Sequence, residues 1–196
     1  KLVIFLDPET KQTRQAIASG NVLASQGTII AKGSFLTWDV NTQSAILEDA
    51  QKAEFVKDDL TIDAQKIIFY KDTGKIDIPS AGNLKAKLRE KKAGKKAAAV
   101  TNKSDTHVRV IWEGKMNFLD TTREASFEKN VEVQKENSTL LCDNLKVTFS
   151  DHDFTMQSLK ATEKIHIIDK RDNLFGEAVG DRATWDAKSK VTVLRG

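Results

Sequence analysis

Hydrophobic and polar residues alternate in short runs along most of the chain. Leu145, Val147 and Phe149 are separated by single polar residues, and side chains two positions apart on a strand point to the same face of a sheet. The same alternation recurs at 76–78, 108–112, 125–127, 131–133, 165–167 and 191–193. Strands with one apolar and one polar face are typical of an antiparallel sheet that is covered on one side. The pattern predicts an all-β protein.

A strand–turn–strand unit recurs along the chain. Each unit has an apolar strand that ends at an aromatic residue or leucine, a polar turn rich in Asp, Thr and Ser, and a second apolar strand. The residues that end the first strands are Leu6, Trp38, Tyr70, Phe118, Phe149 and Trp185. The first three are each 32 residues apart, and the next interval is 48 because a Lys-rich stretch intervenes. Serial hairpins of this kind share one continuous core, so we expect about six units in a single domain, residues 1–196, built as a sandwich, a jelly roll or a solenoid.

The stretch from Leu84 to Lys103 departs from this alternation and is strongly basic. It contains eight Lys and Arg residues and one Glu, although the net charge of the whole chain is only +3. We therefore expect a Lys-rich insertion at about 84–104. One interpretation is a solvated loop with a short helical turn near 86–93, and another is a site for acidic lipid headgroups. The residues that would contact such anions are Lys85, Lys87, Arg89, Lys91 and Lys92. Nucleic acid is not expected as a partner, because no aromatic residue is interleaved with the lysines.

The sequence lacks the motifs that carry enzyme chemistry or hold cofactors. It has no Gly-rich phosphate loop, Gly-x-Ser-x-Gly elbow or His-Glu-x-x-His helix. The three histidines are isolated, and Asp151-His-Asp153 falls at a turn position of the repeat, where we expect it to be solvated. The lone Cys142 is expected to be a buried, unreactive thiol. We expect a non-enzymatic protein without a metal or cofactor.

The two ends of the sequence lie within the repeating pattern. The chain opens on the apolar run 2–6 and closes on an alternating run, so we interpret it as part of a longer protein. Residues 3–6 and 191–194 are then candidate edge strands, whose unpaired backbone groups can accept a strand from a neighbour. No apolar stretch approaches the roughly 20 residues that a membrane-spanning helix needs.

Four short stretches repeat a family pattern in serial order. They are Ala18-Ser-Gly-Asn-Val-Leu23, Glu128-Lys-Asn-Val-Glu-Val133, Leu140-Leu-Cys-Asp-Asn-Leu-Lys-Val147 and Gly176-Glu-Ala-Val-Gly-Asp-Arg-Ala-Thr-Trp185. With them the chain resembles the OstA-like family, which includes the periplasmic lipopolysaccharide-transport proteins LptA and LptC and the N-terminal domain of LptD. The long basic insertion departs from the family pattern. The resemblance implies a V-shaped, twisted antiparallel β-jelly roll in the envelope of a Gram-negative-type bacterium. It also implies end-to-end stacking with other OstA-like domains, and lipopolysaccharide or a related glycolipid as the partner that slides along the interior.

An apolar groove between two splayed sheets would suit the acyl chains of such a lipid, because their contacts are non-directional and each buried methylene is worth roughly 0.8 kcal/mol. The residues expected to line this groove are Phe5, Trp38, Phe69, Trp112, Phe118, Phe127, Val147, Phe149, Met156, Ile165, Ile167 and Trp185. The main alternative is a structural β-repeat scaffold with a closed core and no lipid ligand. A carbohydrate-active or nucleic-acid-binding β protein is the third interpretation.

Overall fold

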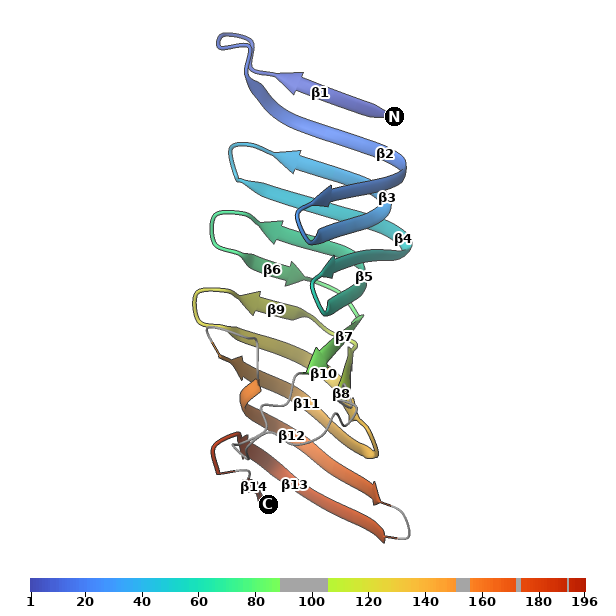
Figure 1. Ribbon diagram of the computed structural model, residues 1–196, viewed down its shortest axis with the longest axis vertical. Coiled ribbons are helices and arrows are strands. Elements are labelled where there is room, and N and C mark those ends of the chain that lie inside the picture. The colour runs from blue at the N-terminus through green and yellow to red at the C-terminus, as the bar shows by residue number, and fades with distance from the viewer. Residues whose placement is uncertain (89–105, 151–155, 172–173, 190) are drawn as a thin grey trace, which may run out of the picture.

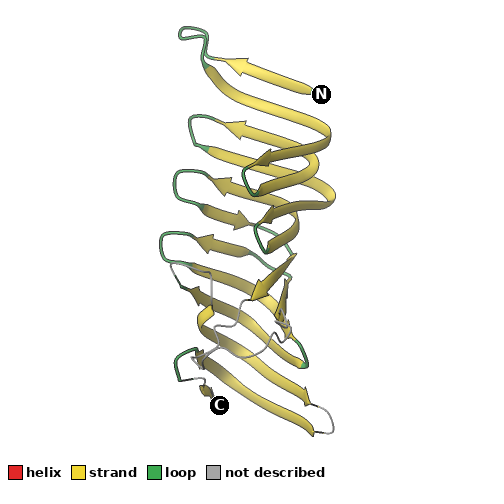
Figure 2. Ribbon diagram, in the orientation of Figure 1, coloured by secondary structure: helices red, strands yellow, loops and turns green. Residues whose placement is uncertain are grey.

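The protein is a single, highly twisted antiparallel sheet (Figures 1 and 2). The structure, a computed structural model, describes residues 1–88, 106–150, 156–171, 174–189 and 191–196. These residues form 14 strands, and the described part of the chain contains no helix. The predicted all-β class is therefore confirmed, and the arrangement is that of a β-jelly roll.

The strands vary in length because some run through both layers of the fold and others occupy only one. Their bounds are β1 Leu2–Leu6, β2 Thr13–Gln26, β3 Ile29–Asp39, β4 Ser44–Lys57, β5 Leu60–Tyr70, β6 Lys75–Ile78, β7 Gly82–Leu88, β8 Thr106–Trp112, β9 Met116–Leu119, β10 Glu124–Lys135, β11 Ser138–Phe149, β12 Met156–Arg171, β13 Leu174–Asp186 and β14 Val191–Arg195. Neighbours along the chain pair in the order β1-β2-β3-β4-β5-β6-β9-β10-β11-β12-β13-β14, and the hairpin β7-β8 bridges β5 and β10. The strands succeed one another along the long axis, and the two termini lie at opposite ends (Figure 1).

The long strands bend at a corner where the pairing register shifts. The shift falls between Ser19 and Val22 in β2, and between Glu128 and Val131 in β10. Gly20 and Asn130 have φ angles of 103° and 48° at these corners. Bulges of this kind bend a strand and increase its twist. The corners divide the sheet into a first layer and a second layer, and a strand that turns a corner contributes to each. The first layer comprises residues 2–19, 35–48, 66–78, 116–128, 144–162 and 182–195, and the second comprises 22–33, 53–64, 82–112, 131–142 and 165–180, where these are described.

The repeat has a local physical cause in the turns of the first layer. In three copies an aspartate carboxylate accepts hydrogen bonds from the backbone N–H and the hydroxyl of a Thr or Ser three residues later. The pairs are Asp7 with Thr10, Asp39 with Thr42 and Asp186 with Ser189. These hydrogen bonds stabilise the charged form, so the pKa of each of the three carboxyl groups is lowered. The recurring Asp-x-x-Thr/Ser sequence thus specifies where these three hairpins turn.

The basic segment begins as a strand, which corrects one expectation. Residues up to Leu88 belong to β7, where Ala86 pairs with Leu60 on one side and Val108 on the other. The prediction of a loop or short helical turn is therefore wrong for residues 84–88. Leu84 is 8% exposed, because its side chain packs in the core and extends the alternating pattern into the basic stretch. The remainder of the expected insertion, from Arg89, lies outside the described residues.

Candidate functional site

Inward-facing side chains of the first layer form one row along the whole sheet. Residues that pair directly across antiparallel strands point to the same face, so the row can be followed through the strand registers. It consists of Ile4, Ala16, Trp38, Ala45, Phe69, Ile76, Phe118, Ala125, Val147, Leu159, Trp185 and Thr192. Eleven of the twelve are apolar, and the row therefore makes a nearly continuous hydrophobic wall.

The second layer supplies a facing row. It consists of Ala24, Ala31, Phe55, Ile62, Leu84, Val110, Val133, Leu140, Ile167 and Ala178, each paired directly with the next. No polar residue interrupts it. The size of the facing side chains then decides whether the space between the layers is filled.

The middle of the molecule is filled. Trp112 and Phe127 are 1% and 2% exposed, and their ring centroids lie 5.3 Å apart. The Trp112 indole N–H donates to the carbonyl oxygen of Ser80 at 2.9 Å. Met116 and Ile165 are also fully buried. Large side chains from the two layers therefore meet here and pack against one another, as in an ordinary protein core.

Near the N-terminus the layers enclose an open cavity of about 650 Å³ between β2, β3, β4 and β5. Its walls include Trp38 and Phe69 from the first layer and Phe55 from the second. Small residues such as Ala24 and Ala31 stand in the second-layer row and leave the space free. The ammonium of Lys71, which also lines the cavity, lies 5.9 Å from the centroid of the Trp38 ring. The cavity is thus mainly apolar with a cation at its wall.

Eleven of the twelve residues predicted to line a groove fall into four groups in the structure. Trp38 and Phe69 line the open cavity. Trp112, Phe127, Val147 and Ile165 lie in the buried core. Phe118, Phe149, Met156 and Ile167 are partly buried and pack against that core. Trp185 is half-buried in the first-layer row.

Phe5 lies on the opposite face of the sheet from this row. It pairs with Gln15, whereas its neighbour Ile4 pairs with Ala16 and faces inward. Sequence reasoning missed the cavity residues Leu36, Leu47 and Phe55. The signal that could have found Leu36 and Leu47 is the two-residue period measured from Trp38 and Ala45.

The predicted anion-contacting lysines lie away from the cavity where they are described. Lys85 is exposed and pairs with Thr61 and Arg109, which places it on the outer face of the second layer. Lys87 pairs with His107 in the β7-β8 hairpin. Arg89, Lys91 and Lys92 lie outside the described residues, as does Asp151-His-Asp153.

Reactive groups in the described residues are few. Burial raises the pKa of the Cys142 thiol to about 12, so it stays protonated and is a poor nucleophile. His166 and Glu177 are 2.6 Å apart on the outer face. Within the described ranges no three His, Cys, Asp or Glu side chains gather in a way that could hold a metal ion. None of the described segments is a helix of the length and hydrophobicity needed to cross a bilayer.

Together the fold and the cavity define a class: an antiparallel β-jelly-roll protein with an apolar interior that is open in part. Residues 114–196 match the family model described as the LptA/(LptD N-terminal domain) LPS transport protein. This confirms, over that part of the chain, the resemblance to the OstA-like family. No curated protein matches the chain significantly.

The family match supports a general role, which the sequence analysis had anticipated. At the family level it is consistent with lipopolysaccharide transport, with an envelope location in Gram-negative bacteria, and with lipopolysaccharide and other transport proteins as partners. The family is non-enzymatic. The matched residues include Met116, Phe127 and Ile165 of the packed core, whereas Trp112 and the cavity residues 24–71 lie outside the match.

Proposed function

We propose that the protein carries the acyl chains of lipopolysaccharide, or of a related glycolipid, in the cavity between β2 and β5, and that it does so in the periplasm. The observation that carries this proposal is the apolar cavity of about 650 Å³. A closed repeat scaffold would need no such space. One continuous sheet joins all the described strands, so we treat residues 1–196 as a single functional domain.

The chemistry of the cavity suits a hydrocarbon chain that must move. Leu36, Ile67 and Phe69 offer contact without directional bonds, and each methylene that they bury contributes roughly 0.8 kcal/mol. A chain can therefore shift along the wall without breaking specific hydrogen bonds. Lys71 supplies a positive charge at the wall of the cavity, where it can attract an anionic group on the lipid.

End-to-end association fits the N-terminal end of the sheet. Leu2, Ile4 and Leu6 are 65%, 53% and 53% exposed, although Ile4 belongs to the inward-facing row. A strand from a neighbouring OstA-like domain, in another chain or in the same polypeptide, would cover this apolar rim and extend the row. Partners of this kind are part of the proposal.

A structural scaffold remains the second candidate, and the filled middle of the molecule favours it. Beyond the cavity, Trp112, Met116 and Phe127 are buried between the two layers. A carrier that passes lipid along its whole length would have to move these side chains. A carrier that holds lipid only in the N-terminal cavity would not.

Photo-crosslinking distinguishes these functions. A benzophenone amino acid is placed at Phe69, which faces the cavity, and as a matched control at Tyr70, which pairs with Ser44 and Lys75 on the outer face. Lipopolysaccharide is expected to label the Phe69 variant and not the Tyr70 variant. Equal labelling at the two positions, or none at either, would contradict the carrier function. Additional labelling at Phe127 would indicate passage through the middle.

A further inference from the structure

The outer face of the first layer carries an unusual group of cations at its C-terminal end. Arg182 on β13 pairs directly with Arg195 on β14, and Lys160 on β12 pairs with Thr184 on β13. All of these side chains are exposed. Ala183, which lies between Arg182 and Thr184 on β13, is 2% exposed and faces the core. The cations therefore lie on the face opposite to the lipid cavity.

Elsewhere on the outer face, lysines are neutralised by acids on the adjacent strand. Lys66 pairs with Glu48 at 2.9 Å, and Lys146 pairs with Glu124 at 2.8 Å. Among the described residues, no hydrogen bond or ion pair joins Lys160, Arg182 or Arg195 to a partner. These three side chains thus depart from the pairing used elsewhere on the same surface.

The nearest acid on this face along β13 is Asp186, and it is already engaged. Its Oδ1 accepts hydrogen bonds from the backbone N–H groups of Lys188 and Ser189 and from the Ser189 hydroxyl. Like charges directly opposite one another on adjacent strands are destabilising. Arg182 and Arg195 therefore repel each other, and an anion from outside the chain would relieve this repulsion.

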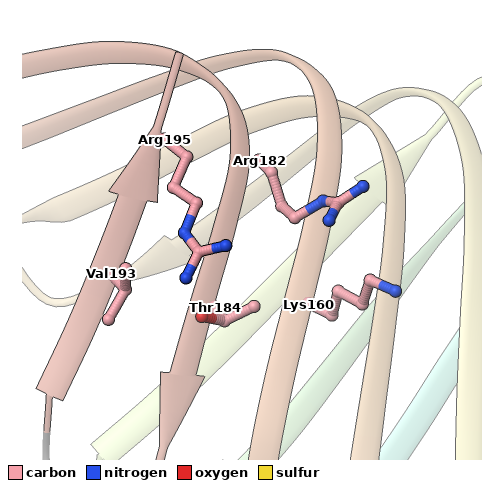
Figure 3. Close-up of a pocket in the computed structure, with 5 residues that line it drawn as sticks. All are labelled: Lys160, Arg182, Thr184, Val193 and Arg195. Carbon is pink, nitrogen blue, oxygen red and sulfur yellow. The ribbon is translucent and has the colours of Figure 1, made fainter.

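The cations surround a cavity rather than a flat surface. The cavity has a volume of about 290 Å³ and is lined by Lys160, Arg182, Thr184, Val193 and Arg195 (Figure 3). Figure 3 shows the three cationic side chains and the Thr184 side chain on the same side of the sheet. No carboxylate contributes to the lining.

This lining suits a phosphate group better than a lone carboxylate. The guanidinium fork of an arginine matches two oxygens of one phosphate, and lysine adds a point charge. The Thr184 hydroxyl can donate a further hydrogen bond to a phosphate oxygen. Val193 provides an apolar contact beside the charges, which fits the carbon face of a sugar ring.

We propose that the outer face of β12, β13 and β14 binds a phosphomonoester, held by Lys160, Arg182, Arg195 and Thr184. The phosphate belongs to a phosphorylated sugar or is free phosphate, and the two sources share the same chemistry. The site goes beyond the proposed lipid-carrier function and does not rest on it, because it lies across the sheet from the apolar cavity.

Isothermal titration calorimetry of the 196-residue chain at low ionic strength tests the site. The probes are N-acetylglucosamine 1-phosphate, inorganic phosphate and, as an uncharged control, N-acetylglucosamine. We expect saturable binding of the sugar phosphate, weakening with added salt, and none of the uncharged sugar. Tighter binding of the sugar phosphate than of inorganic phosphate identifies a sugar phosphate as the source. Equal binding of the two shows that phosphate alone is recognised.

Two variants assign the binding to these residues. Replacing Arg182 and Arg195 together by Gln is expected to weaken binding at least about tenfold. It should leave the melting temperature without ligand unchanged or higher, because it removes a like-charge pair. A matched control, Lys66→Gln with Lys170→Gln, removes the same charge far from the cavity and should bind normally. Lys160→Gln alone provides a milder test.

Three results would overturn the proposal. The first is the absence of saturable binding by either phosphate. The second is unchanged binding in the Arg182 and Arg195 double variant or, if that variant does not fold, in Lys160→Gln. The third is an equal loss in the matched control. None of these results bears on crosslinking of lipid at Phe69, so this site and the carrier function can fail separately.

Discussion

Truncation of Trp112 is the sharpest test of the filled middle of the molecule. The side chain is 1% exposed, packs against Phe127 with a centroid separation of 5.3 Å, and donates a hydrogen bond to Ser80. Replacing a buried Trp by Ala typically costs about 3–5 kcal/mol, because contacts are lost and a cavity remains. For a chain of this size each kcal/mol lowers the melting temperature by about 2–4 °C. We therefore expect Trp112→Ala to lower it by roughly 6–20 °C.

The matched control is Trp38→Ala, which removes the same side chain from the wall of the open cavity. Trp38 is only half-buried, so we expect a loss of about 1–2 kcal/mol. Urea unfolding followed by far-ultraviolet circular dichroism measures the free energy of unfolding without relying on tryptophan fluorescence. If Trp112→Ala costs less than about 1 kcal/mol, or if the two variants lose equal stability, the division into a filled middle and an open N-terminal cavity is wrong.

Three further predictions concern backbone space, acid stability and association. A Cβ on Gly82 would overlap the Trp112 ring, so Gly82→Ala should destabilise by about 1–3 kcal/mol in urea unfolding. A Cβ on Gly176 would meet only one atom, at 4.0 Å, so the control variant Gly176→Ala should be nearly neutral. Hydrogen bonds from Thr42 hold the folded-state pKa of Asp39 below its ordinary value of 3.8. The stabilisation of the fold by the Asp39 carboxylate is therefore present above about pH 3.8 and is lost as the pH falls through the lowered pKa. In acid unfolding experiments, the free energy of unfolding of an Asp39→Ala variant should decrease less steeply with falling pH than that of the unchanged protein. Ile4→Lys should reduce self-association or binding to a partner domain in sedimentation experiments. The control variant Val3→Lys, at a residue that faces outward, should not reduce either. Equal effects of the two variants would argue against stacking at β1.

The fold could be predicted from the sequence because its causes are local. Alternation of apolar residues specified the strands, and polar turns rich in Asp, Thr and Ser marked the hairpins. The facing direction was harder to predict in runs of consecutive apolar residues such as 2–6 and 67–70, because these runs lack the alternation that distinguishes the two faces of a strand. Phe5 was expected inside, yet Ile4 occupies that position. The repeat residue Tyr70 likewise faces outward, and Phe69 takes the place that corresponds to Trp38.

Whether the interior is open could not be predicted from any single strand. The cavity exists because Ala24 and Ala31 stand in the row that faces Trp38 and Phe69, whereas Trp112 fills the equivalent space in the middle. This outcome depends on which side chains oppose one another across two layers, and that pairing is set by the three-dimensional arrangement. The cation group on β12, β13 and β14 could not be predicted from a single strand either, because Lys160 and Arg182 are brought together only by strand pairing.

The two ends of the sheet differ in chemistry, and this difference gives the molecule a direction. The β1 end presents Leu2 and Ile4, while the β14 end presents Thr192 from the inward row and Arg195 on the outside. A contact between unlike ends leaves one end of each kind free, so units can be added indefinitely in a single orientation, whereas a contact between like ends closes at two units. Chains joined through unlike ends would therefore form a polar filament, along which every interior points the same way.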